Sequence, residues 1–96
     1  MTLEQILSDR RKEILRIALK HGARNLRVFG SLARGDAQES SDVDFLVEME
    51  AGRSLFDMGA LQMELRDLLG VEVDVVTYKG LKSRIRERVL HEAIPL

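Results

Sequence analysis

The chain has 96 residues, of which 45% are hydrophobic and 32% are charged, and its formal net charge is −1. This length supports one hydrophobic core, so we expect a single soluble globular domain over residues 1–96. The absence of cysteine excludes disulfide scaffolds and thiolate metal sites, and it fits a reducing, cytoplasmic setting. No apolar run approaches the roughly 18 residues of a membrane span, and the near-neutral charge predicts no direct binding of nucleic acid.

Helical periodicity dominates the start of the chain. Thr2 and Gln5 form a capping-box pattern, and apolar residues at helical spacing predict one amphipathic helix that stops at Gly22. Residues 25–29 are then predicted as a strand and residues 31–37 as one or two turns of helix.

Strands and helices alternate through the rest of the chain. The expected elements are a strand over 43–48, a turn at Ala51-Gly52, a helix from Ser54 to Gly70, a strand over 71–78 and a helix over 81–94 ended by Pro95. The order α-β-α-β-α-β-α predicts a small α/β (α+β) fold in which about four helices flank a three-stranded mixed sheet, largely on one side.

Two carboxylates on one strand are the most informative feature. Successive side chains on a strand point to opposite faces, so Asp42 and Asp44 share one face while Val43 and Phe45 point the other way. Asp74 similarly interrupts an apolar strand, where an unpaired charge is costly. If the two strands are neighbours, three like charges converge, and a divalent cation is the simplest partner for them.

A tight turn precedes these aspartates. Gly30 ends the first strand where the backbone turns closely, and Ser31 begins a short helix whose first N–H groups can bind an anion. A plain turn with an N-cap is the alternative interpretation of this pair. The basic face of the last helix is typical of a solvated surface.

These motifs together resemble a known family. Gly30-Ser31, ten intervening residues, Asp42-Val43-Asp44 and a later strand-borne Asp74 resemble the active-site signature of the DNA polymerase β-like nucleotidyltransferases. More narrowly, GSLARGDA followed by SDVDFLV is similar to the minimal nucleotidyltransferases, small single domains often encoded beside a helical HEPN partner. The resemblance spans the chain from the first helix through the third strand.

The resemblance implies roles for six residues. Asp42, Asp44 and Asp74 would be the catalytic residues and the ligands of two Mg²⁺ ions, while Gly30, Ser31 and Arg34 would hold the triphosphate of ATP. A surface arginine needs no functional explanation, so Arg34 also has a purely solvated interpretation.

The implied function is that of an antitoxin enzyme. It would transfer AMP from ATP to a hydroxyl, with tyrosine expected, of a HEPN ribonuclease toxin. A domain of this size lacks a second wall for the acceptor, which predicts a hetero-oligomer with that toxin or a homodimer. Two alternatives remain: a non-catalytic antitoxin that acts by binding, and a nucleotidyltransferase for small molecules, against which the missing acceptor domain argues.

Overall fold

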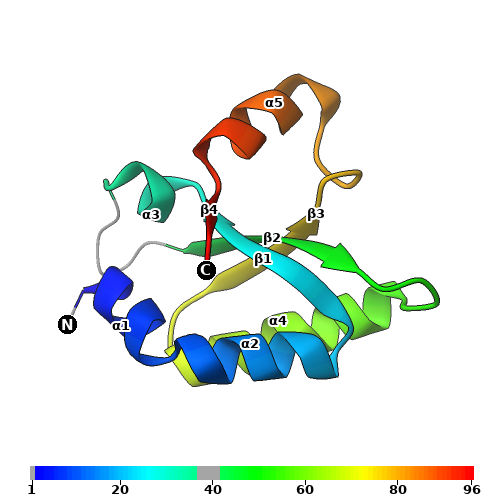
Figure 1. The fold of residues 1–96 in the computed structure, drawn as a ribbon, viewed down its shortest axis with the longest axis horizontal. Coiled ribbons are helices and arrows are strands. Elements are labelled where there is room, and N and C mark those ends of the chain that lie inside the picture. The colour runs from blue at the N-terminus through cyan, green and yellow to red at the C-terminus, as the bar shows by residue number, and fades with distance from the viewer. Residues whose placement is uncertain (1, 37–41) are drawn as a thin grey trace.

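A mixed sheet forms the centre of the fold, with helices against both of its faces (Figure 1). The structure is a computed structural model that describes residues 2–36 and 42–96. In chain order the elements are α1 (Leu3–Asp9), α2 (Arg11–Lys20), β1 (Ala23–Phe29), α3 (Ser31–Arg34), β2 (Val43–Met49), α4 (Leu55–Leu69), β3 (Val73–Thr77), α5 (Ser83–Glu92) and β4 (Ile94–Pro95).

The sheet has the strand order β3-β2-β1-β4. β2 runs parallel to β3, whereas β1 is antiparallel to both β2 and β4. The predicted mixed sheet is therefore confirmed, and the second and third strands are neighbours, which is the condition for the three aspartates to converge. The predicted count of three strands is wrong, because Ile94 and Pro95 form a fourth strand. Two residues are too few to show alternation, and Pro95, which has no N–H to donate, suits the edge of a sheet.

The predicted first helix is divided in two. Arg10 ends α1 and begins α2 with non-helical backbone angles, φ −100° and ψ 8°. Residues 8–13 are all polar, so nothing apolar holds this stretch against the core. The chain therefore bends at Arg10, and Leu7 in α1 and Ile14 in α2 both reach the core.

Other boundaries follow the predictions closely. Ser54 caps α4 with a capping box, and Gly70 ends α4 in the left-handed conformation. The short helix predicted over 31–37 is α3, which ends at Arg34, and Ala37 lies outside the described residues. Among the described helices, none is long and apolar enough to cross a membrane.

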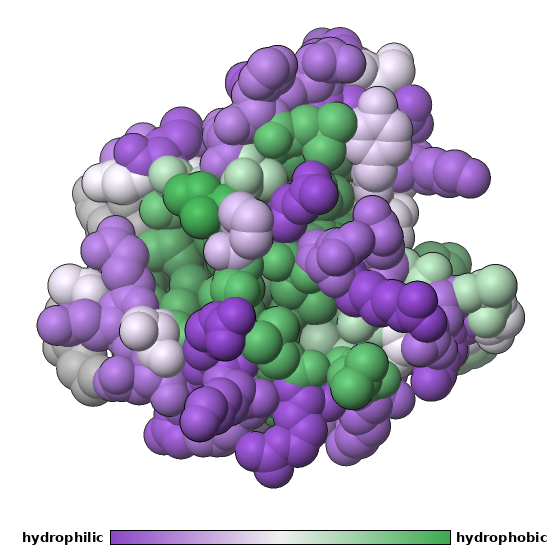
Figure 2. Space-filling model, in the orientation of Figure 1, coloured by the Kyte–Doolittle hydropathy of each residue, from purple (hydrophilic) through white to green (hydrophobic). Residues whose placement is uncertain are grey.

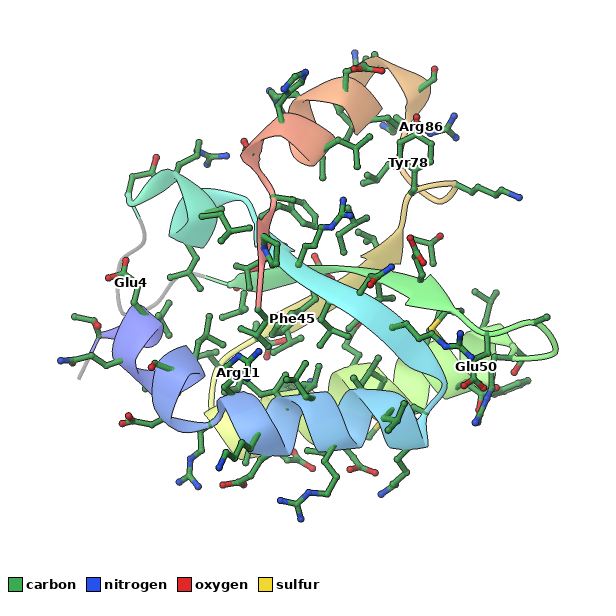
Figure 3. All side chains as sticks on the ribbon, viewed as in Figure 1. Glu4, Arg11, Phe45, Glu50, Tyr78 and Arg86 are labelled. Atoms are coloured by element: carbon green, nitrogen blue, oxygen red, sulfur yellow. The ribbon has the colours of Figure 1, made fainter. Side chains whose placement is uncertain are left out.

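Separate hydrophobic clusters cover the two faces of the sheet. The larger cluster lies against α1, α2 and α4 and includes Phe45, which points from β2 toward those helices (Figure 3). A smaller cluster of Leu46, Leu81 and Val89 lies beneath α5 on the other face. The larger cluster agrees with the expectation of a sheet covered largely on one side, and the smaller cover that α5 adds on the other face was not predicted. On the view in Figure 2, hydrophobic side chains show across the middle of the molecule and hydrophilic ones surround them.

Phe45→Ala is expected to lower the free energy of unfolding by about 3–5 kcal/mol, because it leaves a cavity at a fully buried position. Urea denaturation measures the loss. Phe56→Ala is the matched control, since Phe56 is 89% exposed and its removal should change stability by about 0.5 kcal/mol or less. Equal losses for the two variants would contradict the assignment of Phe45 to the core.

Candidate active site

Three aspartates lie on the sheet face that is opposite the larger cluster. In the parallel pairing of β2 and β3, Asp44 is directly in register with Asp74. Asp42 directly precedes β2 and lies two residues before Asp44, so the two side chains point to the same face. Val43 and Phe45 are fully buried on the reverse face. The structure therefore brings together the three aspartates singled out in the sequence, with Asp44 half-buried and the other two exposed.

Asp44 has the most perturbed electrostatics of the three. Burial, followed by the negative charges of Asp74 and Asp42, raises the pKa of Asp44 to about 6 from an ordinary value of 3.8. The positive charge of Arg34 opposes the shift, and the charge of Glu92 adds to it. A carboxylate in these surroundings favours the arrival of a further positive charge.

The donor chemistry of the three aspartates fits Mg²⁺, which prefers carboxylate oxygens. Within residues 2–36 and 42–96, no group of three acidic or histidine side chains is placed to hold a metal ion. Asp42 and Asp74 are both exposed, however, and exposed side chains change rotamer within nanoseconds. Whether these carboxylates can bind one ion therefore depends on how close the strand register brings their backbones. The register places Asp74 directly beside Asp44.

The turn at Gly30 lies against Asp44. β1 and β2 pair so that Phe29 is opposite Asp44, which brings the following residue close to that carboxylate. Gly30 has φ 77° and ψ −151°, a conformation that is essentially restricted to glycine. A Cβ atom at this position would collide with Oδ2 of Asp44. Only glycine therefore allows the turn and the aspartate to approach so closely.

Ser31 and Arg34 are the first and last residues of α3. Arg34 is about half-exposed and forms ion pairs of 3.4 Å with Asp36 and 3.3 Å with Glu92. Its charge also lowers the pKa of Asp44. The structure thus places the predicted phosphate-binding residues at the edge of the aspartate site, where their role remains a prediction.

Glu92 is a site residue that the sequence did not indicate. Its Oε2 atom accepts a hydrogen bond of 2.7 Å from the backbone N–H of Gly30, and the same atom forms an ion pair with Arg34. The side chain of Glu92 is only 16% exposed. One sequence signal was available: a carboxylate in the last turn of a helix faces the negative end of the helix dipole, an unfavourable position without another partner.

Tyr78 lies farther along the same side of β3, beyond its last residue. The guanidinium of Arg86 sits 5.3 Å from the centre of the Tyr78 ring, and the two side chains lie together near the start of α5 (Figure 3). The same guanidinium donates hydrogen bonds to the backbone carbonyls of Tyr78, Lys79 and Leu81. These contacts assign the pair a packing role at the turn between β3 and α5.

Comparisons with known proteins show the family and the fold of the chain. A profile of the nucleotidyltransferase domain family matches residues 5–96. The chain is 42% identical over 92 residues to the protein adenylyltransferase MntA of Thermococcus cleftensis, covering 96% of this chain and 90% of that protein. A solved structure, provisionally assigned as a minimal nucleotidyltransferase, is 53% identical, covers 100% of this chain and 97% of its own, and superimposes with a TM-score of 0.87. A toxin-antitoxin structure with AMP-PNP shares the fold at 19% identity, with a TM-score of 0.74 over 88% of this chain and 69% of its own.

Proposed function

Since the chain belongs to the nucleotidyltransferase domain family, within the minimal nucleotidyltransferases, we propose that it is a Mg²⁺-dependent protein adenylyltransferase. It transfers AMP from ATP to a hydroxyl of a partner protein. The observation that carries this proposal is the register of Asp44 with Asp74, beside Asp42 and against the Gly30 turn.

The reaction is an in-line displacement at the α-phosphorus of ATP. The acceptor oxygen forms a bond to the α-phosphorus, the bond from that phosphorus to the bridging oxygen of the β-phosphate breaks, and pyrophosphate leaves. Asp74 accepts the proton of the acceptor hydroxyl in this proposal, since it is exposed and lies in register with Asp44 on the neighbouring strand. Asp42, Asp44 and Asp74 would hold two Mg²⁺ ions, which stabilise the charge on the attacking and leaving oxygens.

The Gly30 turn and α3 bind the triphosphate in this proposal. Gly30 permits close backbone approach, Ser31 offers a hydroxyl, and Arg34 offers guanidinium donors that match phosphate geometry. The half-buried position of Asp44 beside them brings the metal ligands and the phosphate contacts to one edge of the sheet.

The partner in this proposal is a HEPN-type toxin, modified on a tyrosine hydroxyl. Support comes from the relative named MntA, and from structural neighbours that are toxin-antitoxin complexes of MntA with HpeT. In this proposal the toxin holds the acceptor hydroxyl against the aspartate site, and the added AMP blocks the toxin by bulk and charge.

Intact-mass spectrometry of the co-purified partner, incubated with this protein, ATP and Mg²⁺, tests the proposal. We expect the mass of the partner to increase by one or more AMP groups, and chelation of Mg²⁺ to prevent the increase. A partner whose mass stays unchanged would refute the proposed function. Peptide mapping of the product then identifies the modified hydroxyl.

Two other functions are separated by a neutralisation assay of variants and by the mass assay, respectively. An antitoxin that acts only by binding would neutralise its partner equally well after Asp42→Asn and Asp44→Asn, whereas the enzyme keeps binding and loses neutralisation. An enzyme for small molecules would leave the mass of the partner unchanged while it still releases pyrophosphate from ATP in the presence of the correct small acceptor.

A further inference from the structure

We propose that Glu92 is a positioning residue of this site, which holds the Gly30 turn and the Arg34 guanidinium where the triphosphate meets them. This inference rests on the proposed function, because it concerns the same nucleotide site. It assigns a role to the C-terminal part of the chain, which contributes neither an aspartate of the triad nor a residue of the glycine turn.

A single carboxylate oxygen makes both contacts. Oε2 of Glu92 lies 2.7 Å from the backbone nitrogen of Gly30 and 3.3 Å from Nη1 of Arg34. The remaining oxygen, Oε1, lies 3.5 Å from the same Nη1 atom. Glu92 is largely buried while Arg34 is about half-exposed, so the pair has one enclosed end and one end open to solvent. Charge-assisted hydrogen bonds in such a setting are among the stronger ones.

The backbone fixes where Glu92 stands. β4 pairs with β1 so that Val28 is opposite Ile94 and Arg27 is opposite Pro95. If this antiparallel register is continued by two residues, Glu92 falls opposite Gly30. The pairing of β4 with β1 therefore places the Glu92 carboxylate at the Gly30 turn. The hydrogen bond between them follows from this pairing and does not depend on how the last turn of α5 happens to be oriented.

The contacts favour positioning over blocking of the nucleotide site. A guanidinium has five N–H donors, and in the described part of the chain the contacts of Arg34 to Glu92 and Asp36 use Nη1 and Nε. The Nη2 donors thus remain for a phosphate. Without the charge of Glu92, Arg34 loses the ion pair that ties it to the residue bonded to the Gly30 N–H, and it keeps its ion pair with Asp36.

Glu92→Gln tests this role, because the amide oxygen can still accept the Gly30 N–H while the charge opposite Arg34 is lost. We expect KM for ATP to rise about tenfold with a smaller change in kcat, which is the effect of losing a charge-assisted contact. Glu92→Asp keeps the charge on a shorter side chain and should recover part of the loss. Glu87→Gln is the matched control, since Glu87 is an exposed carboxylate on the same helix, and its KM should stay at the wild-type value.

Each other outcome overturns the inference. An unchanged KM with a lower kcat and a lower melting temperature would mean that Glu92 acts only in folding. A lower KM would mean that Glu92 competes with the nucleotide. If the wild-type protein transfers no AMP, the proposed function fails, and calorimetric titration with AMP-PNP still tests Glu92: equal affinities of wild type and Glu92→Gln would refute the positioning role.

Discussion

Asp44→Asn is expected to reduce AMP transfer by about 1,000-fold, because it removes a preorganised charge at the centre of the site. The same change should make the folded protein more stable at pH 7.5. The pKa of Asp44 in the folded protein is about 6, above its ordinary value of 3.8, so the folded state binds the proton more tightly than the unfolded state. The stabilisation from that proton is present at low pH and is lost as the pH rises through 6.

Asparagine cannot ionise, so it avoids this loss of stability, which develops between pH 3.8 and about 6 and is complete above pH 6. After discounting for partial exposure, we expect the free energy of unfolding to rise by about 1 kcal/mol at pH 7.5, or about 4–8 °C in melting temperature, and by almost nothing at pH 4. Thermal melts at both pH values, with a chelator present, measure the difference. Asp67→Asn, at an exposed site on α4, is the control and should change neither quantity. A lower melting temperature for Asp44→Asn at pH 7.5 would contradict the claim that the ionised Asp44 carboxylate destabilises the folded protein.

Gly30→Ala is expected to lower both activity and stability. The conformation at Gly30 is essentially restricted to glycine, so alanine costs about 1–3 kcal/mol in strain alone. The new methyl group would also collide with Oδ2 of Asp44, which forces the turn and the aspartate apart. That movement breaks the bond from the Gly30 N–H to Glu92, so we expect transfer to fall by about 100-fold. Steady-state kinetics and urea denaturation measure the two losses.

Gly35→Ala separates backbone strain from the collision. Gly35 also has a positive φ, +80°, but a Cβ atom built on it meets nothing within 4 Å. Its replacement should therefore cost about 1–2 kcal/mol of stability and leave transfer within about threefold of wild type. If Gly30→Ala and Gly35→Ala had the same activity, the close approach of Gly30 to Asp44 would have no role in the reaction.

Local rules were sufficient to predict much of how the candidate site residues are arranged. The period of two along a strand placed Asp42 and Asp44 on one face, and burial of Val43 and Phe45 on the reverse face agrees with this. The adjacency of β2 and β3, on which the position of Asp74 depends, was a condition of the prediction, and the structure meets it. These features depend on neighbours in the sequence or on a common connection between strands.

The missed features depend on contacts between distant parts of the chain. Whether Ile94 and Pro95 form a strand is decided by β1, more than 60 residues away in the sequence, to which they pair. Glu92 meets the Gly30 turn only through that pairing, so its unfavourable place in the last turn of a helix could mark it as unusual but could not show what it contacts. The bend at Arg10 is a different case, because the polar run over residues 8–13 was visible and its effect on the helix was overlooked.

The position of the triad in the sheet also has a kinetic consequence. Asp44 lies on an inner strand and is half-buried, whereas Asp74 lies on β3, the outermost strand on that side, and is exposed. If the proposed function holds, the nucleotide would bind at the deep end of the site and the incoming hydroxyl would meet the shallow rim. A protein docked over that rim would close the entrance, so we expect ATP to bind first and product inhibition to follow the pattern of a compulsory-order mechanism.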